Sequence, residues 1–142
     1  MLKGLEGNKT LISLNLRQND LGGEILENLF TTLASTAVRE LNLSENGIGD
    51  IGCKNFDKMI KGDFGNGLVL EKLHLAKNDI THRGTEFLWN AMSLNRSIKH
   101  LNLKRNEFGP LGMAGFGNFL SSNQGLLSLN MNFCEIKTDG CK

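Results

Sequence analysis

Leucine and polar residues alternate in a short phrase that returns along the chain. In ELNLSEN, residues 40 to 46, Leu41 and Leu43 lie two positions apart and Asn46 follows three positions later. Alternation with a period of two is typical of a half-buried β-strand. A strand alone does not explain the fixed distance to the asparagine, so the phrase also describes the turn that follows the strand.

Five segments fit the pattern L-x-x-L-x-L-x-x-N-x-L when other apolar residues are accepted at the leucine positions. The asparagine position, called the ladder position below, recurs at steps of 27, 32, 28 and 28 residues. Near-constant spacing of this kind is the signature of a repeat architecture. The phrases cover 11–21, 38–48, 70–80, 98–108 and 126–136, and their ladder residues are Asn19, Asn46, Asn78, Asn106 and Cys134.

The segments between the phrases are expected to be helical. Ten and fourteen residues after each ladder asparagine stand two apolar residues, and i, i+4 spacing puts both on one face of a helix. A glycine stands six residues after the ladder position in repeats two to five, where it allows close approach of strand and helix. The apolar pairs are Leu29/Leu33, Phe56/Ile60, Leu88/Met92 and Phe116/Leu120, and the glycines are Gly52, Gly84, Gly112 and Gly140.

Each repeat is therefore predicted to be a strand, a turn, a helix and a return. Strands separated by helices run parallel through right-handed crossovers, and stacked repeats bury one continuous core. We expect an α/β solenoid that curves, with the parallel strands on its concave face and the helices on its convex face. At the ladder position an amide side chain can satisfy buried backbone groups of the bend, whereas Cys134 is interpreted as a packing substitute.

The chain of 142 residues is expected to be one repeat domain. It begins with a partial repeat at 1–10, continues with repeats starting near 11, 38, 70 and 98, and ends with a partial repeat at 126–142. The step of 32 residues places an insertion in the return KGDFGNGLV, residues 61–69, which we expect to be a surface loop. Neither end carries a polar capping repeat, so the chain is interpreted as part of a longer array.

These phrases resemble the leucine-rich repeat family, and the period of about 28 residues is similar to its ribonuclease-inhibitor-like class. The resemblance covers the whole chain. That class includes ribonuclease inhibitors, nucleotide-binding innate-immune receptors, GTPase activators acting on Ran, actin-capping tropomodulins and ciliary proteins. The resemblance implies an intracellular protein that works through contacts with other proteins.

Composition narrows the choice of partner. The formal net charge of +1 favours neither nucleic acid nor an anionic membrane as a partner. The three cysteines are too scattered for a disulfide or zinc framework and fit a reducing compartment. Serines lack a paired base and carboxylates are dispersed, so no catalytic residue, metal or cofactor is expected.

The candidate partner-binding residues lie on the predicted strands and just after them, where alternate side chains face the concave side. Repeats three and four are basic and repeat two is acidic, a pattern that would suit a partner with an acidic patch. The same charges would also suit a solvated sheet face without a partner. Phe133 is either a contact anchor or is covered by a following repeat. The candidates are Glu40, Glu45, Lys72, His74, Lys77, His100, Asn102, Lys104, Arg105 and Phe133.

The sequence thus favours a non-catalytic protein-interaction scaffold in the cytoplasm, within a larger assembly such as a ciliary or cytoskeletal complex. Two alternatives stay open. One is a GTPase activator resembling those that act on Ran, and the other is the sensing segment of an intracellular nucleotide-binding receptor.

Overall fold

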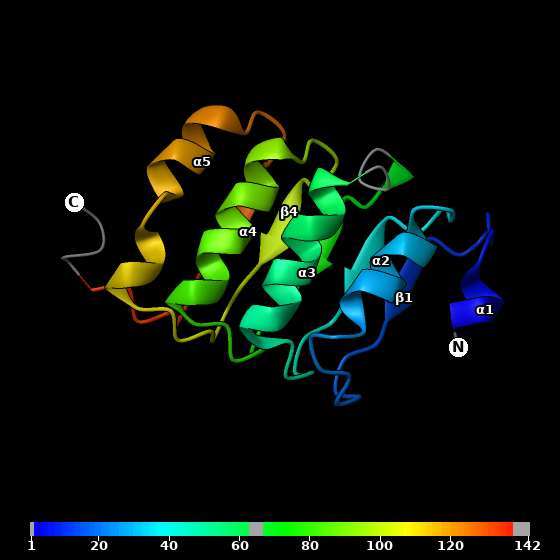
Figure 1. Ribbon diagram of the computed structural model, residues 1–142, viewed down its shortest axis with the longest axis horizontal. Helices are drawn as coiled ribbons and strands as arrows, with labels where there is room; N and C mark the ends of the chain where they lie inside the picture. Colours follow the sequence, from blue (N-terminus) through cyan, green and yellow to red (C-terminus); the bar gives the residue numbers. More distant parts are fainter. Residues whose placement is uncertain (1, 63–66, 138–142) are drawn as a thin grey trace.

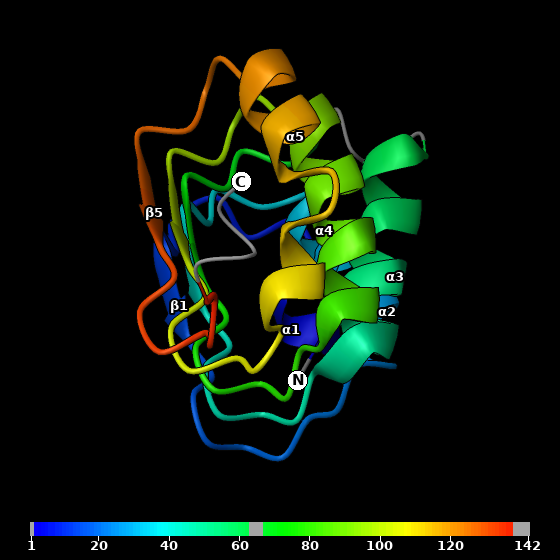
Figure 2. The same cartoon turned by 90° about the vertical axis from the view of Figure 1, so that its left-hand side faces the viewer.

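The computed structural model describes residues 2–62 and 67–137, in which five short strands form one parallel sheet (Figures 1 and 2). The sheet order follows the chain, β1-β2-β3-β4-β5, and each strand pairs in register with the next, so that Leu14, Leu41, Leu73, Leu101 and Leu129 are successive partners. The strands are β1 (Ser13–Asn15), β2 (Glu40–Asn42), β3 (Lys72–His74), β4 (His100–Asn102) and β5 (Ser128–Asn130).

Helices alternate with the strands and form a second layer on one side of the sheet, as Figure 2 shows from the side. This arrangement confirms the predicted α/β leucine-rich-repeat solenoid, with strands on the concave face and helices on the convex face. No helix in residues 2–62 and 67–137 is long and apolar enough to cross a membrane. The helices are α1 (Leu2–Leu5), α2 (Leu26–Leu33), α3 (Gly49–Lys61), α4 (His82–Leu94) and α5 (Phe116–Ser122), with a 3-10 helix η2 (Pro110–Met113).

The core lies between the two layers. The leucines of the central repeats are almost fully buried, and each contributes about 1.5–3 kcal/mol by leaving water. The strand leucines of the first and last repeats are only partly buried, because each has a neighbouring repeat on one side among the described residues. The buried phrase positions include Val38, Leu41, Leu43, Leu70, Leu73, Leu75, Ile98, Leu101 and Leu103.

Close contact between repeats requires glycine at two places. A Cβ on Gly23 would overlap the backbone of Ile48 and Gly52, so the segment before α2 packs directly on the start of α3. A Cβ on Gly84 would overlap Oδ1 of Asp50 and lie 2.9 Å from Cγ2 of Ile80. Of the glycines six residues after a ladder position, Gly84 thus serves the contact with the previous repeat, whereas Gly112 faces Phe108 of its own repeat.

The last helix differs from the prediction. Leu120, expected on the buried face with Phe116, is 51% exposed, and Phe119 is fully buried instead. Gly115 has a left-handed backbone (φ +79°) that separates η2 from α5, so the helix starts late and presents a different face. Phe119 then stacks on the buried Trp89 of α4 at 5.3 Å between ring centroids.

Of the insertion at 61–69, residues 63–66 lie outside the part of the chain that the structure describes, and so does Gly140. After the insertion the chain returns to the repeat, because Leu68 and Leu70 are buried and β3 pairs with β2 in register.

Candidate interaction surface on the sheet face

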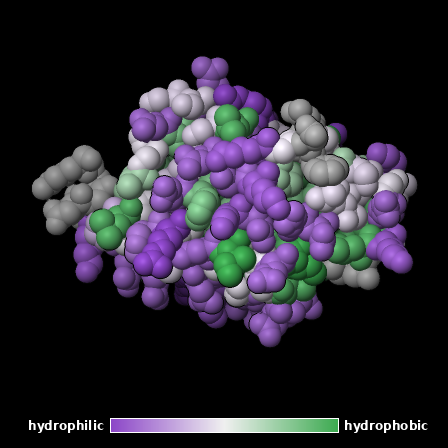
Figure 3. All heavy atoms as spheres, in the orientation of Figure 1, coloured by the Kyte–Doolittle hydropathy of each residue, from purple (hydrophilic) through white to green (hydrophobic). Residues whose placement is uncertain are grey.

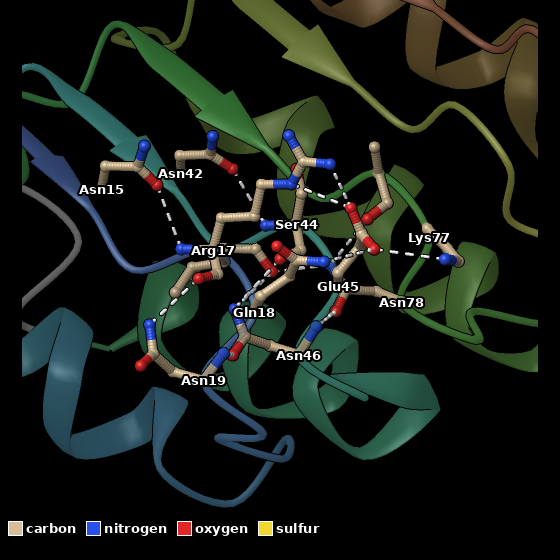
Figure 4. A network of polar contacts seen from close by, with 12 residues as sticks. Asn15, Arg17, Gln18, Asn19, Asn42, Ser44, Glu45, Asn46, Lys77 and Asn78 are labelled. Carbon is tan, nitrogen blue, oxygen red and sulfur yellow. Dashed lines mark hydrogen bonds and ion pairs between the residues drawn. The ribbon is translucent and has the colours of Figure 1, made fainter.

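The ladder residues form a chain of hydrogen bonds just beyond the ends of the strands (Figure 4). Oδ1 of Asn46, Asn78 and Asn106 each accepts the backbone N–H of the ladder residue one repeat earlier. The donors are Asn19, Asn46 and Asn78 in that order, and each N···O distance is 2.9 Å. The three acceptors are almost fully buried. Such buried backbone groups need partners, and here a side chain supplies them.

The amide nitrogens of the same side chains complete the connection. Nδ2 of Asn46, Asn78 and Asn106 each donates to a carbonyl oxygen of the preceding repeat at 2.8–2.9 Å. Each buried ladder asparagine therefore satisfies a donor and an acceptor of its neighbour at once, which is why a residue with both groups recurs at this position.

Cys134 takes the donor part of this role. Its thiol donates to the carbonyl oxygen of Leu103, one repeat earlier, with Sγ 3.1 Å from that oxygen. Burial raises the pKa of the Cys134 thiol, while the nearby amides of Asn106 and Arg105 act in the opposite direction. Burial also raises the pKa of Cys53 far above its ordinary value, and the charge of Asp50 adds to the rise. Both thiols stay protonated at neutral pH and are poor nucleophiles.

A second row of asparagines lies at the end of the strands. Oδ1 of Asn15, Asn42, Asn102 and Asn130 accepts, in each case at 3.0 Å, the backbone N–H of the residue two positions later. This local bond holds the chain as it leaves the strand. In Asn102, a candidate partner contact, Oδ1 thus accepts a hydrogen bond within the chain. Its Nδ2 group makes no hydrogen bond among the described residues. The sequence indicated this second row through the recurrence of asparagine between the two apolar residues of the strand phrase.

Glu45 is the centre of an ion-pair network between repeats one, two and three (Figure 4). Its carboxylate accepts from Arg17 through Nε at 2.8 Å and through Nη2, from Gln18 at 3.2 Å and from Lys77 at 3.1 Å. The hydrogen bonds from Arg17 and then Lys77 lower the pKa of Glu45 below its usual value. Arg17 and Gln18 were not among the predicted site residues, although Gln18 is the residue of repeat one that corresponds to Glu45 and Arg17 directly precedes it.

Glu40 engages two more of the predicted basic residues. Its Oε2 lies 3.4 Å from Nζ of Lys72, and its Oε1 lies 3.3 Å from Nε2 of His74. Together with the pair between Lys77 and Glu45, these contacts mean that both sheet-face lysines of repeat three are matched by carboxylates of repeat two.

The cations of repeat four are arranged differently. Lys104 and Arg105 form no ion pair with any carboxylate in residues 2–62 and 67–137, and both approach the ring of Phe133. Nζ of Lys104 lies 5.7 Å, and Cζ of Arg105 lies 5.6 Å, from the centroid of that ring. Phe133 itself is 70% exposed. His100 lies beside Lys72 in the register. The lysine and arginine of the sheet face that lack a described carboxylate partner are therefore both in repeat four.

The residue before the ladder position has a left-handed backbone in every repeat. The φ values are 58° for Gln18, 59° for Glu45, 53° for Lys77, 59° for Arg105 and 59° for Phe133. This conformation is uncommon for residues with a side chain, and it persists where the surrounding structure fixes it. The ladder bonds provide that support, so the five side chains are held in one row at the edge of the sheet face.

The described residues hold no group of three or more His, Cys, Asp or Glu side chains placed to bind a metal ion. His74 and His100 are diagonal neighbours on adjacent strands, as the sequence suggested, and His74 is directed to Glu40. What the sheet face offers is a set of hydrogen-bonding groups, two unmatched cations and an exposed ring.

The helix face is more uniform. Hydrophilic side chains cover most of the face in Figure 3, and the hydrophobic ones form separate spots. Lys58 and Lys61 on α3 are paired with Glu27 at 2.7 Å and Asp57 at 2.6 Å. Scattered exposed apolar residues on such a face are ordinary and do not mark a binding site.

The family model for the leucine-rich repeat matches residues 7–30, 34–56, 94–117 and 122–142. The chain therefore belongs to the leucine-rich repeat family. The stretch between the second and third matches contains β3 and α4, which form the same strand–helix unit in the structure.

The similar proteins of known sequence are large. The mouse protein "NACHT, LRR and PYD domains-containing protein 14" is 33% identical over 115 residues, which are 80% of this chain and 11% of that protein. The human "NACHT, LRR and PYD domains-containing protein 13" is 29% identical over 110 residues, 78% of this chain and 10% of that protein. The chain spans about a tenth of the length of these curated relatives.

Two solved structures share the fold. Leiomodin-1 actin-binding site 2 has a TM-score of 0.73 at 21% identity, and the matched part is 93% of this chain and 75% of the leiomodin-1 chain. The tropomodulin C-terminal domain of Caenorhabditis elegans has a TM-score of 0.75 at 14% identity, and the matched part is 99% of this chain and 84% of the tropomodulin chain. At these identities the likeness concerns the fold.

Proposed function

We propose that this chain is a non-catalytic protein-interaction module whose partner docks on the concave strand face and places an acidic patch against repeat four. The observation that carries the proposal is the distribution of charge on this face. Glu40 and Glu45 pair with sheet-face cations of repeats one and three, namely Arg17, Lys72 and Lys77. Lys104 and Arg105 form no ion pair with a described carboxylate. Unmatched like charges in a concavity steer an oppositely charged partner and raise its association rate.

The setting that we propose is the cytoplasm, in an assembly connected with the cytoskeleton. One of the two solved structures is an actin-binding site of leiomodin-1, which makes actin the first candidate partner to test. We therefore suggest cosedimentation with filamentous actin and size-exclusion chromatography with monomeric actin, alongside quantitative capture of partners from a cell extract.

The deciding experiment compares two charge reversals of equal size. The variant Lys104→Glu/Arg105→Glu changes the sheet face, and Lys54→Glu/Arg83→Glu changes exposed helix residues that likewise lack an ion pair among the described residues. We expect the first variant to associate about tenfold more slowly with its partner, with a weaker salt dependence, and the second to behave like the original protein. If only the helix-side variant loses its partner, the helices are the binding surface and the proposal is wrong.

A second candidate function is the sensing segment of a longer receptor. The curated relatives are named for NACHT, LRR and PYD domains and are about ten times longer than the matched segment, which favours this candidate. It differs from the first in requiring further domains in the same chain, and sequencing of the full transcript would decide between them. GTPase activation remains a prediction from the resemblance alone.

A further inference from the structure

We propose that Phe133, Lys104 and Arg105 form a binding site for a short segment of the partner in which an aromatic side chain stands next to a carboxylate. The inference rests on the proposed function and deepens it, because it names the anchor on the sheet face and the chemistry of the segment that the anchor takes.

Phe133 is held in place although it is exposed. Its backbone is left-handed at φ +59°, and the following residue, Cys134, is fixed by its bond to the carbonyl of Leu103. The backbone N–H of Arg105 donates to the carbonyl oxygen of Asn132 at 2.9 Å, which links the two repeats beside the ring. The same backbone conformation recurs at this position in all five repeats, so the turn of the repeat determines where Phe133 stands.

A hollow of about 730 Å³ opens beside the ring. This volume lies within the range of about 300–1,000 Å³ that is usual for ligand pockets. Its lining combines three residues that directly precede a ladder position with three acidic residues that directly follow one. The first three are Lys77, Arg105 and Phe133, the acidic three are Asp79, Glu107 and Glu135, and Ile80 and Thr81 complete the lining. The hollow thus has room for a large side chain, and the ring of Phe133 is part of its lining.

The charges beside the hollow favour an acidic residue next to the large side chain that would enter it. Lys77 is already paired with Glu45, but within residues 2–62 and 67–137 Arg105 and Lys104 have only the ring of Phe133 as a partner for their charge. A carboxylate next to an incoming aromatic residue can accept hydrogen bonds from the guanidinium and the ammonium group while the two rings pack together. Arginine and aromatic residues are also the types that dominate binding energy at protein interfaces.

The acidic lining residues limit how much negative charge the ligand can carry. Asp79, Glu107 and Glu135 would repel a phosphate backbone that ran through the hollow, so a polyanion such as single-stranded nucleic acid is disfavoured. A peptide with one carboxylate beside its aromatic residue can place its single charge next to Lys104 and Arg105, by the ring of Phe133. The observations therefore favour a protein segment.

The test is an NMR titration of the 15N-labelled chain with synthetic peptides. The probes are Gly-Ser-Asp-Trp-Gly-Ser, its variants with Ala for Trp or Lys for Asp, and an oligothymidylate. We expect the Asp-Trp peptide to bind most tightly and to shift the amides of Lys104, Arg105 and Phe133. Phe133→Ala should weaken this binding about tenfold, as loss of an anchor residue does.

Leu127→Ala provides the matched control, because Leu127 is 76% exposed in the same repeat and does not line the hollow. It should leave binding unchanged, and circular dichroism should show all variants folded. The proposal is overturned if Phe133→Ala binds as tightly as the original chain, if the Ala or Lys peptide binds equally well, or if the oligonucleotide binds better. It is also overturned if the same shifts appear on raising the protein concentration alone, since a second copy would then occupy the site.

These outcomes are independent of the charge reversals described above. If the peptide binds at Phe133 but the natural partner ignores Lys104→Glu/Arg105→Glu, the site is present and the proposed function is wrong. If the natural partner responds to the charge reversal but not to Phe133→Ala, the function stands and this inference is wrong.

Discussion

The side-chain oxygen Oδ1 of Asn78 accepts the backbone N–H of Asn46, 32 residues earlier in the chain, at 2.9 Å. The same oxygen accepts the N–H of Ile48 at 3.2 Å, and Nδ2 of Asn78 donates to the carbonyl oxygen of Leu43 at 2.9 Å. One buried side chain therefore makes three hydrogen bonds to backbone groups of the preceding repeat that have no partner within their own bend.

Asn78→Ala should consequently lower the free energy of unfolding by about 1–3 kcal/mol, because it leaves buried backbone groups without partners. Asn102→Ala removes one local bond at a half-buried position and should cost less. Urea denaturation of both variants provides the measurement. Equal losses would show that the two asparagine rows are energetically alike and would contradict the ladder interpretation.

Cys134→Asn should stabilise the protein. In the other repeats Oδ1 accepts two backbone amides of the preceding repeat, and a thiol is a weaker acceptor. An asparagine at 134 offers the missing acceptor to the bend at Asn106, and we expect a gain of about 0.5–1.5 kcal/mol in thermal or urea denaturation. Cys134→Ser is the control, because it keeps a small donor without supplying the amide geometry. A loss of stability on Cys134→Asn would mean that the site is too tightly packed for an amide.

The repeat fold followed from the sequence because leucine spacing and the ladder residue are local signals that recur five times. The pairing of charges could not be predicted in the same way. Arg17 and Lys77 reach Glu45 from opposite sides, and which side chains meet depends on rotamers and on distances between repeats. The sequence therefore indicated a basic region over repeats three and four, whereas the structure leaves the unmatched cations at Lys104 and Arg105.

The last helix departed from the pattern for a similar reason. Its apolar spacing was correct for a regular helix, but the left-handed Gly115 interrupts the segment and rotates the residues that follow. Phe119 then replaces Leu120 against Trp89. The left-handed conformation of Gly115 thus determined which face of the helix is buried. The spacing of apolar residues gives no information about such a conformation.

The network around Glu45 predicts a defined pH dependence. Because hydrogen bonds from Arg17 and Lys77 lower the pKa of Glu45 in the folded protein, its contribution to stability is present above its ordinary pKa of about 4.3. That contribution is lost as the pH falls through the lowered folded value. The difference in urea midpoint between the original protein and Glu45→Gln should thus be largest near neutral pH and should vanish in acid.

Glu24→Gln serves as the control for this experiment. Glu24 is exposed and forms no ion pair within the described residues, so its replacement changes the net charge equally without touching the network. A pH dependence for Glu24→Gln as large as that for Glu45→Gln would show that the effect comes from overall charge.

Adding one methyl group at two glycines should have opposite effects. Gly84 lies against Asp50, whose carboxylate accepts from the backbone N–H of Thr81 at 2.8 Å and from its hydroxyl at 2.6 Å, so Asp50 cannot easily move away. Gly84→Ala should therefore cost about 1–3 kcal/mol through overpacking. In α5, a Cβ on Gly117 would meet nothing within 4 Å, and Gly117→Ala should stabilise the helix by about 0.5–1 kcal/mol. Both values can be read from urea denaturation, and a neutral Gly84→Ala would mean that the repeats do not pack as tightly as the structure places them.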